Sequence, residues 1–259
     1  MKKIYLLYRN QQLHLVGAIL FLLIIFLAFK AGANPIISAI STNQINIDTD
    51  FKGAEILLFG SKAERGELII VLRGPKRKYM VTKKEKLLGI WHNGKRVVFE
   101  DAYSHYSMFL VSDNLNLKAS LFNDLELGLN NLKFKAAAKE DLRLQEEFKL
   151  QLISNLKKEH LYSDGQKNIE FFDDNLFKAI LKFPKNISYG IYTAEIYLIK
   201  DERLSTFQSI PIFVNQVGDI AKIRNFAYQN PFLYALIAIL IAIIAGFIAN
   251  YIFSRFIHK

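Results

Sequence analysis

The sequence contains no cysteine, so it can form neither disulfides nor thiolate metal sites, and any chemistry must come from other side chains. Ser104 and His105 place a hydroxyl beside an imidazole, the two groups that form a nucleophile and its general base. Adjacent residues of a strand point to opposite faces, so a regular strand would separate these groups. His92, His105 and His160 lack the mutual spacing of metal ligands, and the sequence therefore predicts no metal site.

The sequence also lacks the common catalytic motifs. It contains no G-x-S-x-G elbow, P-loop, H-E-x-x-H motif or dinucleotide fingerprint. Its acidic pairs, Asp173-Asp174 and Asp201-Glu202, lie in predicted turns, where solvated carboxylates are common. We therefore expect that the protein is not an enzyme and uses no cofactor.

The densest positive cluster consists of Arg73, Lys76, Arg77 and Lys78, with three further lysines downstream. Such a cluster can bind an anionic ligand or lipid head groups. It is also typical of a solvated hairpin whose charges prevent edge-to-edge pairing with another sheet. We favour the solvated hairpin and keep ligand binding by these four residues as the alternative.

Trp91 is the only tryptophan of the chain. It lies beside Asn93-Gly94, a dipeptide that predicts a tight hairpin turn. A tryptophan at such a position most often packs on the core of a β-sandwich. If it were exposed instead, it would provide an anchor for a protein partner.

The most informative segment is the uncharged stretch of residues 232–253. At about 1.5 Å rise per residue it is long enough to cross a hydrocarbon core roughly 30 Å thick. Pro231 suits the first turn of a helix, where its missing N–H costs nothing. These features predict a transmembrane helix over residues 231–253, followed by a short tail, residues 254–259.

Four small residues of this predicted helix form stripes on its surface: Ala242, Ala245, Gly246 and Ala249. Small side chains allow another helix to approach closely. We therefore expect an integral membrane protein as a partner on this face and the lipid bilayer around the rest. The alternative explanation is that glycine is simply frequent in transmembrane helices, as alanine is.

The N-terminus has the features of a secretory signal: three basic residues, an apolar run over residues 13–29 and small residues at 31–33. Residues 1–33 are either a cleaved signal peptide or an uncleaved signal anchor, since the apolar run is at the lower length limit for a span. Both alternatives place residues 34–215 in the periplasm and the tail 254–259 in the cytoplasm. The predicted location is the cell inner membrane.

The net charge of +10 largely reflects this topology. Six of the 34 lysine and arginine residues lie in the predicted membrane ends, so the exported part is only mildly basic. A mildly basic domain outside the cytoplasm is not expected to bind nucleic acid.

Between residues 34 and 215, short apolar runs separated by turn residues are typical of a β-sandwich. Apolar residues at every fourth position predict two helices, which form a helical insertion at about residues 113–165. Helical spacing also predicts a juxtamembrane amphipathic helix within residues 216–230. Strands are expected at 44–48, 55–60, 67–72, 78–82, 96–100, 105–111, 169–172, 176–183, 191–200 and 203–214.

The predicted fold class is therefore mainly β, an immunoglobulin-like antiparallel β-sandwich with a helical insertion and one C-terminal transmembrane helix. The immunoglobulin-like part rests on the turn chemistry of residues 184–195, which is typical of the last hairpin of such domains. About ten strands are too many for either half of the domain alone and suit a single sandwich interrupted by the helices.

Six motifs together carry a family resemblance. They are FKGAEILLFG at 51–60, VLRGP at 71–75, GIWHN at 89–93, LGLNNL at 127–132, YTAEIYLI at 192–199 and NPFLY at 230–234. From about residue 37 to its end, the chain resembles an uncharacterised alphaproteobacterial family of transmembrane proteins. That family has no assigned activity, so the resemblance implies an architecture and an inner-membrane location and no particular chemistry.

These observations predict a non-enzymatic, membrane-anchored periplasmic protein that serves as an accessory or interaction subunit. Its partner would be an inner-membrane transporter or another envelope assembly. The alternative function is that of a tethered module that captures an anionic ligand through the basic cluster.

Overall fold

A computed structural model describes residues 35–87, 89–111, 118–138, 141–166 and 168–257. The chain divides into two compact units, Met1–Pro35 and Ile36–Lys259. The predicted leader, residues 1–33, and the end of the predicted tail lie outside the described residues.

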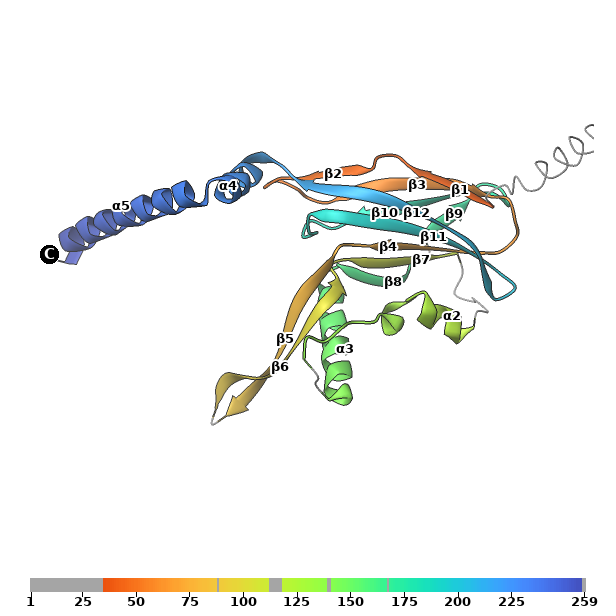
Figure 1. Ribbon diagram of the computed structural model, residues 1–259, viewed down its shortest axis with the longest axis horizontal. Helices are drawn as coiled ribbons and strands as arrows, with labels where there is room; N and C mark the ends of the chain where they lie inside the picture. The colour runs from red at the N-terminus through yellow and green to blue at the C-terminus, as the bar shows by residue number, and fades with distance from the viewer. Residues whose placement is uncertain (1–34, 88, 112–117, 139–140, 167, 258–259) are drawn as a thin grey trace, which may run out of the picture. The chain divides into compact units, whose positions relative to one another are not determined.

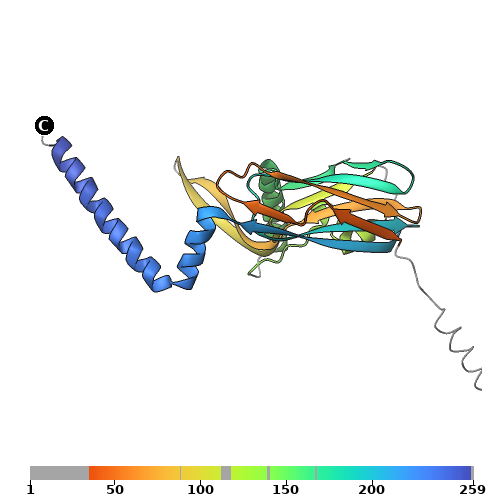
Figure 2. The same ribbon diagram turned by 90° about the horizontal axis from the view of Figure 1, so that it is seen from above.

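Two β-sheets form the sandwich of the second unit (Figures 1 and 2). The first sheet has four antiparallel strands in the order β1 (Ile36–Ile40), β3 (Ala54–Lys62), β10 (Leu176–Phe183), β9 (Ile169–Phe171). The second has six in the order β2 (Gln44–Ile47), β12 (Arg203–Gln216), β11 (Gly190–Lys200), β4 (Glu67–Arg73), β7 (Tyr106–Leu110), β8 (Tyr162–Gln166).

The predicted class, a mainly-β fold with a helical insertion and a C-terminal apolar helix, is confirmed. The prediction that all strands run antiparallel is wrong at both edges of the larger sheet. There β2 pairs parallel to β12, and β8 pairs parallel to β7. Long stretches of the chain separate β2 from β12 and β7 from β8, and such connections allow the second strand of each pair to run in the same direction as the first.

The core follows from the apolar pattern of the strands. In β10, Phe177, Ala179, Leu181 and Phe183 are buried, while the residues between them are partly or fully exposed. In β4 all five residues from Leu68 to Leu72 are buried. A strand buried on both faces reads as a continuous apolar run, and here the helical insertion covers the face that the first sheet does not.

Strand pairing defines the two ends of the sandwich. Gly190 pairs with Val214 near the end of β12, and Thr193 pairs with Arg73 at the end of β4. The ends of β12 and β4 therefore lie together, at what we call the tether end because β12 leads from it toward the apolar helix. The opposite or distal end contains Ile36, which pairs with Lys62.

A long hairpin leaves the tether end between β4 and β7. It consists of β5 (Lys76–Leu87) and β6 (Ile90–Tyr103), which pair with each other and with neither large sheet (Figure 1). The predicted turn at Asn93-Gly94 is wrong: Leu87 pairs with Ile90, so the chain reverses there, with Gly89 at a φ of 86°. Asn93 and Gly94 lie instead at a β-bulge, where β6 has one residue more than β5.

The helical insertion contains α2 (Ala119–Asp124), the 3-10 turn η1 (Leu129–Asn131) and α3 (Leu142–Lys158). The first predicted stripe does not form one helix, because Glu126 adopts a φ of 51° and turns the chain after Leu125. The second stripe does: α3 buries Phe148, Leu152 and Leu156. The helix ends at Lys158, so the residues predicted to stop it, 163–165, belong to β8.

Two helices follow the sandwich, α4 (Gly218–Gln229) and α5 (Pro231–Ile257). Both were expected from their periodicity and hydropathy. The part Pro231–Ser254 has a mean hydropathy of 2.8, and it is the one helix of the described chain that is long and apolar enough to cross a membrane.

Candidate functional site

The four cations of the predicted basic cluster lie apart in the structure, and three of them have different partners. Lys76 lies 3.8 Å from Asp101, Arg77 donates to the carbonyl oxygen of Tyr189 at 3.0 Å, and Lys78 is exposed. Arg73 points into the fold, where only 11% of its side chain is exposed. The four residues therefore do not form one surface for an anionic ligand.

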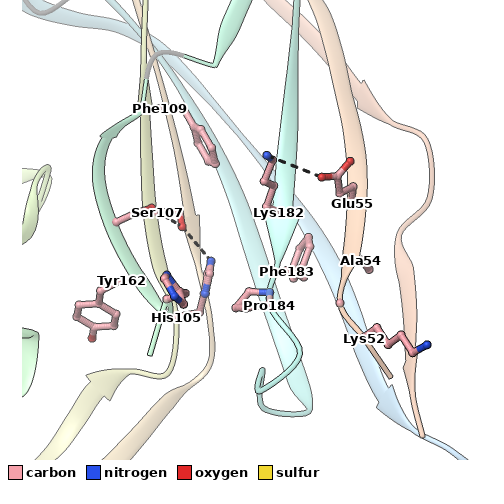
Figure 3. A pocket seen from close by; sticks show the side chains of 13 residues that line it. Lys52, Ala54, Glu55, His105, Ser107, Phe109, Tyr162, Lys182, Phe183 and Pro184 are labelled. Atoms are coloured by element: carbon pink, nitrogen blue, oxygen red, sulfur yellow. Dashed lines mark hydrogen bonds and ion pairs between the residues drawn. The ribbon is translucent and has the colours of Figure 1, made fainter. Parts of the chain in front are cut away.

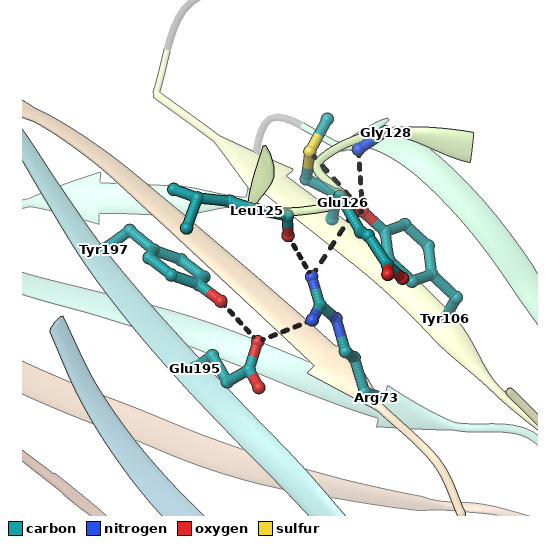
Figure 4. Close-up of polar contacts among 8 residues, drawn as sticks. Arg73, Tyr106, Leu125, Glu126, Gly128, Glu195 and Tyr197 are labelled. Carbon is teal, nitrogen blue, oxygen red and sulfur yellow. Dashed lines mark hydrogen bonds and ion pairs between the residues drawn. The ribbon is translucent and has the colours of Figure 1, made fainter. Parts of the chain in front are cut away.

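Arg73 joins the larger sheet to the helical insertion (Figure 4). Its guanidinium lies 3.2 Å from the Glu195 carboxylate, which also accepts a 2.6 Å hydrogen bond from the Tyr197 hydroxyl. On the other side it donates to the carbonyl oxygens of Leu125 and Glu126, at 2.7 and 3.2 Å. Burial is the largest single influence and opposes the positive charge, but Glu195 together with Tyr197, Tyr103 and Tyr106 outweighs it, so the pKa of Arg73 is raised.

Tyr106 completes the same junction. Its hydroxyl donates to the Glu126 carbonyl oxygen at 3.1 Å and accepts from the Gly128 N–H at 2.7 Å. Burial raises the pKa of this hydroxyl well above its usual value, so it stays protonated. Arg73 and Tyr106 thus pin the turn around Glu126 to the sheet, and we interpret the arrangement as structural.

Trp91 lies near the end of the β5–β6 hairpin. The expectation that it packs on the core is wrong, because it is 65% exposed. Lys86, which pairs with it across the hairpin, has its Nζ atom 5.9 Å from the centre of the ring. The residue is therefore available to a partner.

Ala242, Ala245, Gly246 and Ala249 lie on one face of α5 at the spacing of three and four residues that a helix face requires. A side chain placed on Gly246 would meet nothing within 4 Å. Ala235 and Ala238 extend this face, so all five alanines of α5 follow a strict three-four repeat. We call these six positions the small-residue face. The sequence-based prediction covers only the second half of this repeat, from Ala242 to Ala249.

A cavity of about 520 Å³ lies between the ends of β3 and β10 on one side and β7 with β8 on the other (Figure 3). Its walls combine apolar side chains with hydroxyls and cations. The polar residues include His105, Ser107, Ser163, Lys52 and Lys182. The Lys182 Nζ atom lies 3.9 Å from the Glu55 carboxylate at the rim.

A buried hydrogen-bonded chain connects two hydroxyls and an imidazole in this cavity. Ser163 Oγ donates to Ser107 Oγ at 2.9 Å, and Ser107 Oγ lies 3.0 Å from His105 Nε2. His105 is 1% exposed, and burial lowers its pKa to about 4, so the imidazole is neutral at neutral pH. Its Nδ1 atom is buried with no hydrogen-bond partner in the described part of the chain.

This pairing differs from the one the sequence brought forward. Ser104 does not bond to His105; Ser107, two residues further on, lies on the same strand face and does. A catalytic serine–histidine pair needs a third group to orient the imidazole and an accessible hydroxyl. Here no carboxylate bonds to Nδ1 within the described residues, and Ser107 is 5% exposed. The absence of enzyme activity nevertheless stays a prediction.

No group of three or more metal-ligating residues is found among the residues that the structure describes. Comparison with known proteins adds one result. The family model described as "Putative transmembrane protein (Alph_Pro_TM)" matches residues 35–255. No curated protein and no solved structure matches the chain.

Proposed function

The chain belongs to this Alph_Pro_TM family of transmembrane proteins, and from that premise we propose that it is a non-enzymatic interaction subunit of a membrane assembly. In this proposal α5 spans the inner membrane, and the sandwich lies in the periplasm and carries no catalytic site. The partner is an integral membrane protein, such as a transporter to which this chain is an accessory.

The observation that carries the proposal is the small-residue face of α5. Alanines at 235, 238, 242, 245 and 249 follow the three-four spacing at which two helices pack along a shared seam. Beside them, Gly246 leaves open space where a side chain would stand. In a bilayer there is no hydrophobic force between helices, so close packing of small residues favours their association. Frequent use of alanine alone would not place every alanine on one face.

The strand order supports an immunoglobulin-like identity for the domain. In that fold strands A, B, E and D form one sheet, and β1-β3-β10-β9 occupy the equivalent positions. The order β12-β11-β4-β7 is equivalent to G, F, C and C′ of the other sheet. Tyr192 near the start of β11 bonds to the backbone of Ser188 at 2.9 and 3.1 Å, as the tyrosine corner of strand F does. This likeness supports an interaction domain by analogy only, because a fold alone fixes no activity.

Purification of the full-length protein from its native membranes in a mild detergent tests the proposal. We expect an integral membrane protein to copurify in fixed ratio and to be lost from the Ala242→Leu/Gly246→Leu variant. Ile244→Phe, which adds volume outside the small-residue face, is the matched control and should retain the partner. Isolation of the protein alone, or equal yield of the partner with both variants, would contradict the proposal.

A second candidate function is capture of a small anionic ligand, and the cavity beside His105 favours it over the dispersed basic cluster. Lys52 and Lys182 line this cavity, and the free Nδ1 of His105 is suited to one acceptor atom. Titration calorimetry with phosphate, sulfate and acetate tests it. Binding that is lost in Lys52→Ala/Lys182→Ala but kept in Lys200→Ala would support this function, and no heat with any of the three anions would count against it.

A further inference from the structure

We propose that the end of the β5–β6 hairpin binds the surface of the bilayer that α5 enters. In this interaction lysines contact anionic lipid head groups, and Trp91 and Ile90 enter the lipid–water interface. We call residues 84–86 of β5 and 90–96 of β6 the hairpin tip. The proposal does not depend on a partner protein, so it can be tested independently of the proposed function.

Large apolar side chains are exposed on the hairpin. Ile90 is 73% exposed and Trp91 65%, and Met80, lower on β5, is 63% exposed. Tryptophan is enriched where membrane meets water, because its ring is apolar and its N–H can still bond to head groups. Exposed apolar side chains gathered in this way indicate an interaction surface.

The charge around these side chains favours a lipid surface as the occupant. Five cations and one carboxylate lie between Lys83 and Arg96. Lys86 is paired directly with Trp91, and Lys84 lies on the same face two residues earlier. Lysine and arginine close to an anionic membrane surface each add to binding, while the apolar residues enter the interface.

The sheet register brings the start of the hairpin and the end of β12 to the same end of the sandwich. β12 runs to the tether end before the chain continues into α4 and α5, and β4 delivers β5 to that same end. A strand of 12 residues such as β5 extends about 40 Å, whereas the 12 residues of α4 extend only about 18 Å. The hairpin is thus long enough for its tip to reach the bilayer that α5 enters.

The base of the hairpin is held in place and its tip is not. Glu100 donates its N–H to Lys135, and Ala137 donates to Val98, so residues 135–137 border the base of β6. On β5, Lys83 forms a 3.3 Å ion pair with Glu147 of α3. Beyond this ion pair, the pairing of β5 with β6 is what supports the tip. A supported base with a projecting apolar and cationic tip is suited to touching a surface.

Fluorescence of Trp91 tests the proposal directly, because Trp91 is the only tryptophan of the full chain. The full-length protein is placed, one copy per disc, in lipid nanodiscs of phosphatidylcholine with phosphatidylglycerol. We expect emission at shorter wavelength than in detergent, several-fold weaker quenching by acrylamide, and quenching by lipids brominated on the acyl chain. Acrylamide is uncharged, so changes of protein charge do not alter its access.

Lys84→Glu/Lys86→Glu should restore acrylamide quenching to the detergent level. Lys200→Glu/Arg203→Glu, the same charge change at the distal end, should leave Trp91 protected. As a control reporter, Trp91→Phe/Phe172→Trp moves the fluorophore to an exposed distal position and should show no protection. Full acrylamide access to Trp91 in nanodiscs would overturn the proposal. Protection without quenching by brominated lipid would overturn it as well, because a protein contact and not lipid would then cover the tip.

Discussion

The guanidinium carbon of Arg224 in α4 lies 4.7 Å from the centre of the Tyr189 ring, just before β11. Arg77 at the base of β5 lies 4.9 Å from the same ring. One aromatic side chain at the tether end therefore contacts both the helix that leads to the membrane and the hairpin. Arg224 also donates to the Gln216 side chain at 3.0 Å, which ties α4 to the end of β12.

Tyr189→Ala should loosen α4 from the sandwich. Loss of a cation–π contact at a partly exposed site costs about 1 kcal/mol, which corresponds to roughly fivefold more frequent opening. Hydrogen exchange of the α4 amides measures this change. Lys222→Ala is the control, since Lys222 pairs only within α4, with Asp219. Equal exchange in Tyr189→Ala and the unchanged protein would show that the ring does not hold the helix.

Arg73→Ala should destabilise the domain strongly. It removes the cation that pairs with Glu195 and the donor to two carbonyl oxygens, which costs about 3 kcal/mol or more. Urea unfolding of the full chain in detergent gives the free energy of unfolding. Lys200→Ala breaks an exposed pair with Glu64 and should cost no more than about 1 kcal/mol. Similar losses in the two variants would contradict the structural role of Arg73.

Stability should fall with acidification because of His105. The folded pKa of this buried imidazole is about 4, below its ordinary value of 6.5, so the unfolded chain binds the proton more tightly. Above pH 6.5 the imidazole is neutral in both the folded and the unfolded state. As the pH falls from 6.5 to 4 the unfolded state takes up the proton first, so the free energy of unfolding decreases by up to about 3 kcal/mol. In His105→Gln this part of the pH dependence should disappear, whereas His92→Gln at the exposed tip should keep it. The measurement is the free energy of unfolding against pH.

Elements with a strong repeating pattern could be predicted from the sequence. The alternation in Phe177 to Phe183 and the continuous run Leu68 to Leu72 define β10 and β4, and the stripe from Leu144 to Leu156 defines α3. These patterns arise because apolar side chains are buried at regular positions along one segment, so they can be seen in the sequence itself. The hydropathy of residues 231–254 identified α5 for the same reason.

Features that depend on distant pairing could not be predicted. Asn93-Gly94 has the chemistry of a tight turn, but the pairing of Leu87 with Ile90 makes it a bulge. Arg73 belongs by sequence to a basic cluster, yet in the fold it is largely buried and forms an ion pair with Glu195, which is far away in the chain. The cavity around His105 is likewise built from segments separated by the whole insertion. Of the candidate site, only the small-residue face of α5 lies within one local segment and was therefore visible in the sequence.

In the proposed function the small-residue face of α5 contacts a partner helix, and photo-crosslinking in living cells tests this contact directly. A photoreactive amino acid is introduced at Ala249, on that face, and separately at Ile244, on the opposite side of α5. We predict a discrete crosslinked product with one integral membrane protein from position 249 and none from position 244. Equal crosslinking from both positions, or none from position 249, would contradict the claim.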